Sequence, residues 1–247
     1  HHGDLTFSMI YAYSEDYMLT FSHDDVVNGK ESMIRKMPGR TAQQEANLRA
    51  AYAYMTGHPG KKLLFMGQEF AQEKDWDADN EQDCAQVEEE EHQKMQHFVS
   101  DLNNFYQTHP ALYRLDYDPD GFEWINSISA NENMLVFARN TEKKEDTILA
   151  VVNFSPVTYE KRKIGVPWSG KYKEIFNSDR EEYGGSGAGN PRVKQSRKEE
   201  CDGREHSITI TVPPMSVLFF AFAGTAPRAA TNREAKANYN KKKQEEL

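Results

Sequence analysis

Hydrophobic and polar positions alternate in two different ways along the chain. In the first part, short apolar runs end abruptly in polar residues, as in residues 17–25 and 62–69. A continuous apolar run is typical of a parallel strand that is buried on both faces. Between and after these runs, apolar residues recur at helical spacing and predict helices over Thr41–Gly57 and from about Val87 to Thr108. The first part therefore has a strand–helix–strand–helix order.

The helix over Thr41–Gly57 carries its own start and stop signals. Thr41 can cap its first turn, and Gln44, three residues later, completes a capping box. The sequence His-Pro-Gly at 58–60 ends it, because proline cannot continue a helix.

The pattern changes after Pro110. Short β-rich segments follow one another, and threonines alternate with Ile208 and Ile210, which is the pattern of a half-buried strand. The segments are residues 121–127, 133–139, 147–153, 171–176, 207–212 and 217–222. They predict an antiparallel β-sandwich over residues 111–224, after an α/β part over residues 1–110. Residues 225–247 are charged, have almost nothing apolar to bury, and are expected to be a disordered tail.

Composition narrows the function classes. The formal net charge of -9 repels phosphate backbones, so no nucleic-acid partner is expected. No apolar run approaches the roughly 20 residues that cross a bilayer, so no membrane partner is expected either. The two cysteines, Cys84 and Cys201, are far apart and outside any CxxC motif. Reduced thiols and a cytoplasmic location are the resulting expectation.

The polar cluster after the first apolar run contains adjacent carboxylates, Asp24 and Asp25, next to His23. If the strand continued through them, the two side chains would point to opposite faces, so they make a poor acid/base pair. Retaining glycosidases need two carboxyls roughly 5 Å apart across the bond they cleave. One aspartate can face a pocket beside His23. The alternative is a Ser-His-Asp-Asp turn that caps the next segment.

Two other patterns indicate where a functional site is expected and where it is not. In (β/α) barrels the chemistry lies at the carboxyl ends of the strands, which is where both polar clusters of the first part stand. The glycine-rich stretch at 183–190 lacks the Lys-Ser or Lys-Thr ending of a phosphate cradle and does not open a helix. A nucleotide site is therefore not expected there. No metal-ligand cluster stands out along the sequence.

Residues 21–30, Phe-Ser-His-Asp-Asp-Val-Val-Asn-Gly-Lys, closely resemble the segment of glycogen branching enzymes that holds the fourth conserved region of the alpha-amylase superfamily. Residues 61–72 resemble the following family segment, with Trp76 at the expected distance. Further similar segments are residues 46–49, 121–124, 177–179 and 213–215. The resemblance covers roughly residues 1 to 223, in order and without large gaps.

This resemblance implies the C-terminal part of a (β/α)8 barrel followed by the β-sandwich. Branching enzymes cut an α-1,4-glucan and transfer the released segment to a 6-hydroxyl by a retaining mechanism, without a cofactor. Asp24 matches the aspartate that supports the transition state, and His23 matches the histidine that binds the sugar at the cleavage point. Gln68, Glu69 and Trp76 are expected to bind substrate, with Trp76 as a stacking platform.

The resemblance also implies what the chain lacks. The family's nucleophile and acid/base lie on earlier strands, so we expect an N-terminal barrel part as partner and no activity from these 247 residues alone. Asp25 stands where the family commonly has glutamate, and Cys84 stands where it has tryptophan. Two alternatives remain open: a non-catalytic glucan-binding fragment or subunit, and a hydrolase of the same superfamily such as an amylase.

Overall fold

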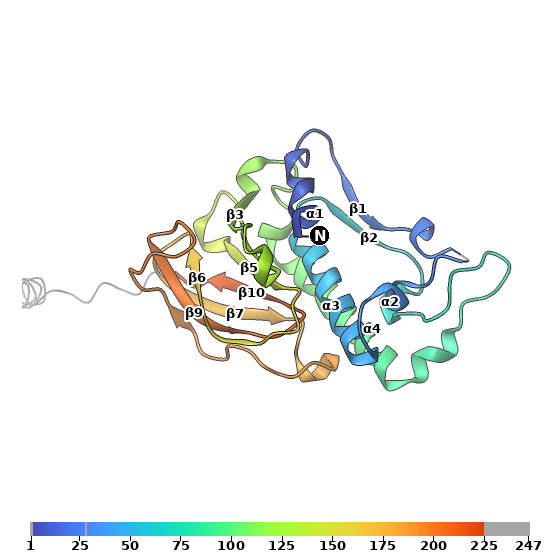
Figure 1. Cartoon of the computed structure of the whole chain (residues 1–247). Coiled ribbons are helices and arrows are strands. Elements are labelled where there is room, and N and C mark those ends of the chain that lie inside the picture. The colour runs from blue at the N-terminus through green and yellow to red at the C-terminus, as the bar shows by residue number, and fades with distance from the viewer. Residues whose placement is uncertain (1, 28, 225–247) are drawn as a thin grey trace, which may run out of the picture.

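A computed structural model describes residues 2–27 and 29–224 (Figure 1). The predicted tail at 225–247 lies outside the described residues. Four α-helices, joined in places by single 3-10 turns, are α1 (His2–Phe7), α2 (Met33–Lys36), α3 (Thr41–Gly57) and α4 (Glu90–Thr108). The strands are β1 (Met18–Phe21), β2 (Lys61–Leu64), β3 (Phe122–Asn126), β4 (Met134–Arg139), β5 (Ile148–Asn153), β6 (Tyr159–Val166), β7 (Lys171–Asn177), β8 (Lys194–Gln195), β9 (His206–Val212) and β10 (Ser216–Phe222).

The first part of the chain forms a parallel pair of strands. β1 and β2 pair in register, with Phe21 opposite Leu64, and α2 and α3 make the crossover between them. On one face of the pair, Phe21 packs against Tyr52 of α3 at 5.8 Å between ring centroids. On the other face, Met18 is 54% exposed and Leu63 is 38% exposed. Among the described residues neither outer edge of this pair has a partner strand, so the pair is open on one face and at both edges.

The all-β part has two antiparallel sheets. Six strands pair in the order β3-β4-β5-β10-β7-β8, and β6 pairs with β9. A buried cluster that includes Val151, Ile208 and Phe220 fills the space between the two sheets. The predicted antiparallel β-sandwich is therefore present. The prediction missed β6, because charged residues from Glu160 to Lys163 interrupt the apolar alternation along its exposed half.

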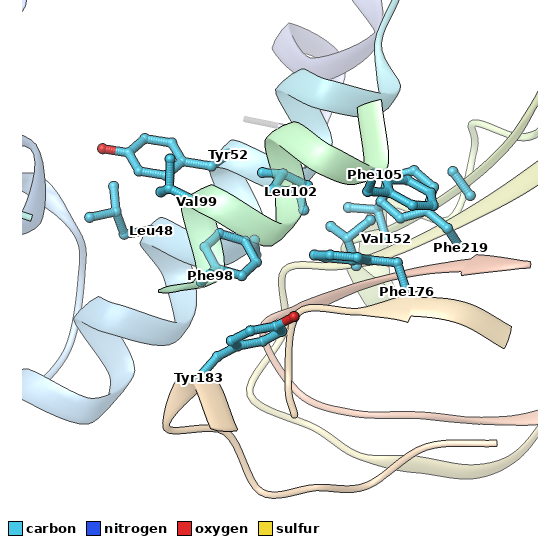
Figure 2. Close-up of a cluster of buried hydrophobic side chains, with 14 of the residues drawn as sticks. Leu48, Tyr52, Phe98, Val99, Leu102, Phe105, Val152, Phe176, Tyr183 and Phe219 are labelled. Carbon is cyan, nitrogen blue, oxygen red and sulfur yellow. The ribbon is translucent and has the colours of Figure 1, made fainter. Parts of the chain in front are cut away.

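The other face of the six-stranded sheet packs on the helices. Phe219 of β10 lies 5.0 Å from Phe105 of α4 between ring centroids, and Phe176 of β7 lies at the same distance from Phe105. Figure 2 shows these rings together with Leu48, Tyr52 and other side chains of α3 and α4 in one cluster. The helices thus lie between the parallel pair and the six-stranded sheet (Figure 1). The division near residue 110 stays a prediction, and the hydrophobic core runs across it.

The start of α3 differs from the prediction. Arg40 occupies the cap position, and its backbone N–H donates to Oε1 of Gln43 at 3.1 Å, so the box lies one residue earlier than Thr41 and Gln44 suggested. Gln44 instead reaches back to the carbonyl of Met37. The predicted stop is confirmed, because α3 ends at Gly57. α4 begins at Glu90, since the residues before it form a 3-10 turn.

The glycine-rich stretch closes around a carboxylate. The backbone N–H of Ser186 donates to Oδ1 of Asp179 at 3.1 Å, and the N–H of Gly187 donates to the Asp179 carbonyl at 2.8 Å. The Tyr183 hydroxyl then donates to Asp101 of α4 at 2.6 Å. This stretch therefore fastens the all-β part to the helices.

A buried ion pair also joins the two parts. Arg139 of β4 donates through Nη2 to Oδ1 of Asp116 at 2.8 Å, and both side chains are at most 1% exposed. The other guanidinium nitrogens donate to the carbonyls of Gly57 and Gly121. The second oxygen of Asp116 accepts from Nζ of Lys61 in β2 at 3.0 Å. Asp116 is thus a direct link between the parallel pair and the six-stranded sheet.

Candidate functional site

The carboxyl ends of β1 and β2 lie side by side. The N–H of Phe65 donates to the carbonyl of Phe21 at 3.1 Å, which extends the pairing one residue beyond the strands. Farther on, the N–H of Trp76 donates to the carbonyl of Val26 at 2.7 Å. The turn after β1 and the segment from Phe65 to Trp76 after β2 therefore lie side by side beyond the carboxyl ends of the two strands.

The adjacent aspartates have different surroundings. They do not continue β1, because His23–Asp25 forms a 3-10 turn. Asp25 Oδ2 accepts hydrogen bonds from the N–H of Ser22 at 2.7 Å and from its hydroxyl at 3.3 Å. Asp25 therefore closes the turn, as in the capping alternative. The side chain of Asp24, in contrast, is 77% exposed.

His23 stands beside Asp24 and inside an aromatic group. Its Nε2 lies 3.3 Å from Asp24 Oδ1, and its side chain is 53% exposed. Its ring lies 5.9 Å from that of Phe65 and 6.0 Å from that of Trp76, and Phe65 and Trp76 are 5.3 Å apart. The structure thus brings together His23, Asp24 and Trp76, three of the five predicted site residues, and adds Phe65.

Phe65 was not predicted as a site residue. It stands in the apolar run that predicted β2, so the sequence indicated burial for it. Its place one residue after β2, opposite the turn after β1, is what brings it to His23. The parallel register of the two strands is the signal that would have found it.

Gln68 lies beneath this surface. It is buried, its Oε1 accepts from the N–H of Phe65 at 3.3 Å, and its carbonyl accepts from the Tyr52 hydroxyl at 3.2 Å. These bonds shape the turn after β2. Gln68 therefore supports the residues that face the surface, and its predicted contact with substrate stays a prediction.

Glu69 faces a different space. It lines a cavity of about 460 Å³ between β2, α3 and α4, together with Lys61, Lys62 and Tyr106. Burial lowers the pKa of Lys62 in this wall to about 7, and its Nζ donates to the carbonyl of His58 at 2.7 Å. The predicted contact of Glu69 with substrate stays a prediction.

The side chains at the carboxyl ends of β1 and β2 support only a limited range of chemistry. Nζ of Lys30 donates to the carbonyl of Asp24 at 2.7 Å, and Lys36 binds the carbonyl of Asp25, so both lysines hold the turn by its backbone. Among residues 2–27 and 29–224 no group of three or more His, Cys, Asp and Glu side chains could hold a metal ion. The same residues include no helix long and apolar enough to cross a membrane. Asp24 and His23 can thus bind hydroxyls beside an aromatic surface.

Comparison with known proteins finds a family match in the all-β part and similar proteins over most of the chain. The family model for the C-terminal all-beta domain of alpha amylase matches residues 124–223. The 1,4-alpha-glucan branching enzyme GlgB of Cereibacter sphaeroides is 47% identical over 219 residues, which are 89% of this chain and 30% of that protein. The branching enzyme of Aquifex aeolicus is 45% identical over 224 residues, 91% of this chain and 36% of that protein.

The chain matches the C-terminal portion of 1,4-alpha-glucan branching enzymes. The resemblance noted on residues 21–30 and 61–72 is thereby confirmed. The chain spans about a third of the length of the branching enzymes it matches. The match therefore does not by itself assign to this chain the nucleophile, the acid/base or the activity of the whole enzymes.

Solved structures superpose on most of the chain. A maltotriose complex of AmyP superposes with a TM-score of 0.59 at 13% identity, over 91% of this chain and 44% of that one. A debranching enzyme of Nostoc punctiforme superposes with a TM-score of 0.56 at 14% identity, over 83% and 35% of the two chains. At such identities the similarity shows fold alone.

Proposed function

We propose that this chain forms one wall of the active site of an α-1,4-glucan branching enzyme. The observation that carries the proposal is the placement of His23 and Asp24 at the carboxyl ends of two adjacent parallel strands, beside Trp76. The enzyme would cleave an α-1,4-glucan and transfer the segment to a 6-hydroxyl, with retention. The α-glucan is the substrate, and the reaction requires no cofactor.

Asp24 is the residue suited to support the transition state. Because Asp25 is used in the turn, Asp24 keeps its carboxylate available for the sugar. The transition state resembles an oxocarbenium ion, and hydrogen bonds to sugar hydroxyls that tighten there lower the barrier. His23 lies within 3.3 Å of Asp24 and would hold the same sugar, while the Trp76 ring offers a stacking surface.

The nucleophile and the acid/base would come from an N-terminal barrel part. The open face and edges of the β1–β2 pair support this view, because barrel strands have both edges paired and both faces covered. Met18 and Leu63 would then face the barrel interior. In solution without that part, we expect the region around the pair to aggregate or to be partly unfolded.

A chimaera tests this proposal. This chain would replace the matching C-terminal portion of the Cereibacter sphaeroides branching enzyme, and amylose branching would be followed by the iodine spectrum. The chimaera should branch amylose, and Asp24→Asn should lower its rate by about 100-fold or more. Asp120→Asn, an exposed aspartate far along the chain, is the matched control and should leave the rate unchanged.

The outcomes separate the alternatives. Full activity in the Asp24→Asn chimaera would contradict the role given to Asp24. Branching by the 247-residue chain alone would contradict the need for a second part. Glycogen pull-down by the chain, with an inactive chimaera, would favour the non-catalytic glucan-binding reading, and release of linear oligosaccharides without branching would favour a hydrolase.

A further inference from the structure

The imidazole of His23 is held by few contacts. Its side chain is 53% exposed, and within the described part of the chain its one polar partner is Asp24, whose Oδ1 lies 3.3 Å from Nε2. A side chain so exposed would normally rotate among several staggered conformers. The ring centroids of Phe65 and Trp76 lie 5.9 Å and 6.0 Å from that of the imidazole. These two aromatic contacts are therefore what can hold the imidazole in one orientation.

The rings of Phe65 and Trp76 form a corner. Their planes stand at 86° to each other, with the centroids 5.3 Å apart. The imidazole is tilted by 54° against Phe65 and by 77° against Trp76, and edge-to-face or tilted contacts of this kind are favourable between aromatic rings. A flat ring in such a corner is blocked on two sides. The orientation that it keeps places Nε2 of His23 beside Asp24.

Phe65 is anchored through its backbone. Its N–H donates to the carbonyl of Phe21 at 3.1 Å and to Oε1 of the buried Gln68 at 3.3 Å. Its carbonyl accepts from the N–H of Gln68 at 3.1 Å. The carbonyl of Gln68 accepts in turn from the hydroxyl of Tyr52, a fully buried residue of α3, at 3.2 Å. A continuous series of hydrogen bonds thus joins the core helix to the residue beside His23.

Trp76 differs from Phe65 in its place and in its proposed role. It lies outside the helices and strands, and its N–H donates to the carbonyl of Val26 at 2.7 Å. Its ring is the surface on which the sugar is proposed to stack. Phe65 has no such role assigned to it, so any effect of its ring on the reaction has to pass through His23.

We propose that Phe65 is a positioning residue of the branching reaction. Its ring holds the imidazole of His23 against Trp76 with Nε2 turned to Asp24, so that imidazole and carboxylate meet the same sugar unit. The inference rests on the proposed glucan function. A displacement of about 1 Å in a group that contacts the reacting sugar can lower a rate by about 100-fold, so the ring behind that group affects catalysis without touching substrate.

The chimaera with the Cereibacter sphaeroides enzyme provides the test. Phe65→Leu, which removes the flat ring, should lower kcat about tenfold and leave KM within about twofold, because the orientation matters most in the transition state. Phe65→Tyr keeps the ring and should keep kcat within about threefold. Phe70→Leu is the matched control: its ring, 3% exposed, faces His92 of α4, so stability should fall and kcat should not.

A double-mutant cycle with His23→Ala separates positioning from a general structural effect. In the His23→Ala background, Phe65→Leu should change kcat by less than about twofold, because the imidazole that it positions is already absent. The same tenfold loss in both backgrounds would overturn the proposal, and so would an unchanged kcat in Phe65→Leu alone. If thermal unfolding shows that Phe65→Leu is not folded, Phe65→Met replaces it, with the same changes expected.

Crystal structures of the chimaera and of its Phe65→Leu variant decide the inference without reference to activity. The imidazole should have one orientation in the parent and should turn away from Asp24 in the variant. An imidazole that stays in place without the Phe65 ring would overturn the proposal, even if the chimaera were inactive. Failure of the glucan function has a different signature, which is full branching activity in Asp24→Asn.

Discussion

Two of the sheets in the described part of the chain, the six-stranded sheet and the β1–β2 pair, differ in how completely they are covered. All six residues of β4 are buried, because helices cover one face of its sheet and β6 and β9 cover the other. None of the four residues of β1 is buried to that degree, and its sheet ends after one neighbour. The same helices, α3 and α4, pack between them. We therefore expect the stability of each sheet to depend more on what covers it than on its own strands.

Substitution of one large residue in each sheet gives the strongest test of this comparison. Phe219→Ala removes a fully buried ring at the contact with α4 and should lower the free energy of unfolding by about 3–5 kcal/mol. Leu63→Ala on the open face should change it by no more than about 0.5 kcal/mol. Urea unfolding followed by circular dichroism measures both. An equal loss in Leu63→Ala would show that the open face is covered in solution.

The link between the sheets should give the next largest effect. Asp116→Asn removes the charge that pairs Arg139 of the closed sheet with Lys61 of the open one. Breaking a buried pair from one side leaves an uncompensated charge, so about 3 kcal/mol of stability should be lost. Glu142→Gln, in the exposed pair with Arg114, should cost less than about 1 kcal/mol. Comparable losses of stability in both variants would show that the buried ion pair contributes no more than the exposed one.

Lowering the pH should reduce the free energy of unfolding by a smaller amount, through His58, which lies just before β2. Burial lowers the pKa of His58 to about 4, and the ring is held between the Ser8 hydroxyl at 2.8 Å and the Pro59 carbonyl at 3.0 Å. The unfolded chain takes up the proton near pH 6.5, whereas the folded chain resists it until about pH 4. Stability is thus lost as the pH falls through this window.

Between pH 7 and pH 5 the loss assigned to His58 is about 2 kcal/mol. Urea unfolding at the two pH values measures it, and His58→Gln, which cannot titrate, should show a loss smaller by that amount. If the two proteins lose stability equally over this range, His58 does not carry the effect.

Sequence patterns predicted the elements that carry a run or a period of apolar residues. The apolar run predicted β2, but its expected burial on both faces is wrong, because Leu63 is 38% exposed and no barrel neighbour covers that face among the described residues. The periodicity of α3 was sufficient, because buried residues recur along most of the helix. β6 was missed because its first half is exposed and charged. The cap of α3 was misplaced by one residue, because the Gln43 side chain bonds the backbone N–H of Arg40, and arginine is not a usual capping residue.

The site residues show the same distinction: local sequence and strand pairing place some of them, and tertiary packing places the others. His23, Asp24 and Trp76 come together because strand pairing fixes their places. The capping role of Asp25 was weighed as an alternative, since such turns are written in local sequence. The side on which Glu69 lies depends on the packing of α3 against α4. The position of Glu69 could therefore not be predicted from sequence spacing.

The shared core has a consequence for recombination between related enzymes. A crossover in the segment after α4 would separate Phe105 from Phe176 and Phe219, and Asp101 from Tyr183. The Phe105 ring of one protein would then pack against a sheet surface from another protein, whose side chains differ in shape. Exchange of the all-β part between homologues should therefore give a folded protein only when α3 and α4 are exchanged with it. The unit of recombination thus begins before these helices.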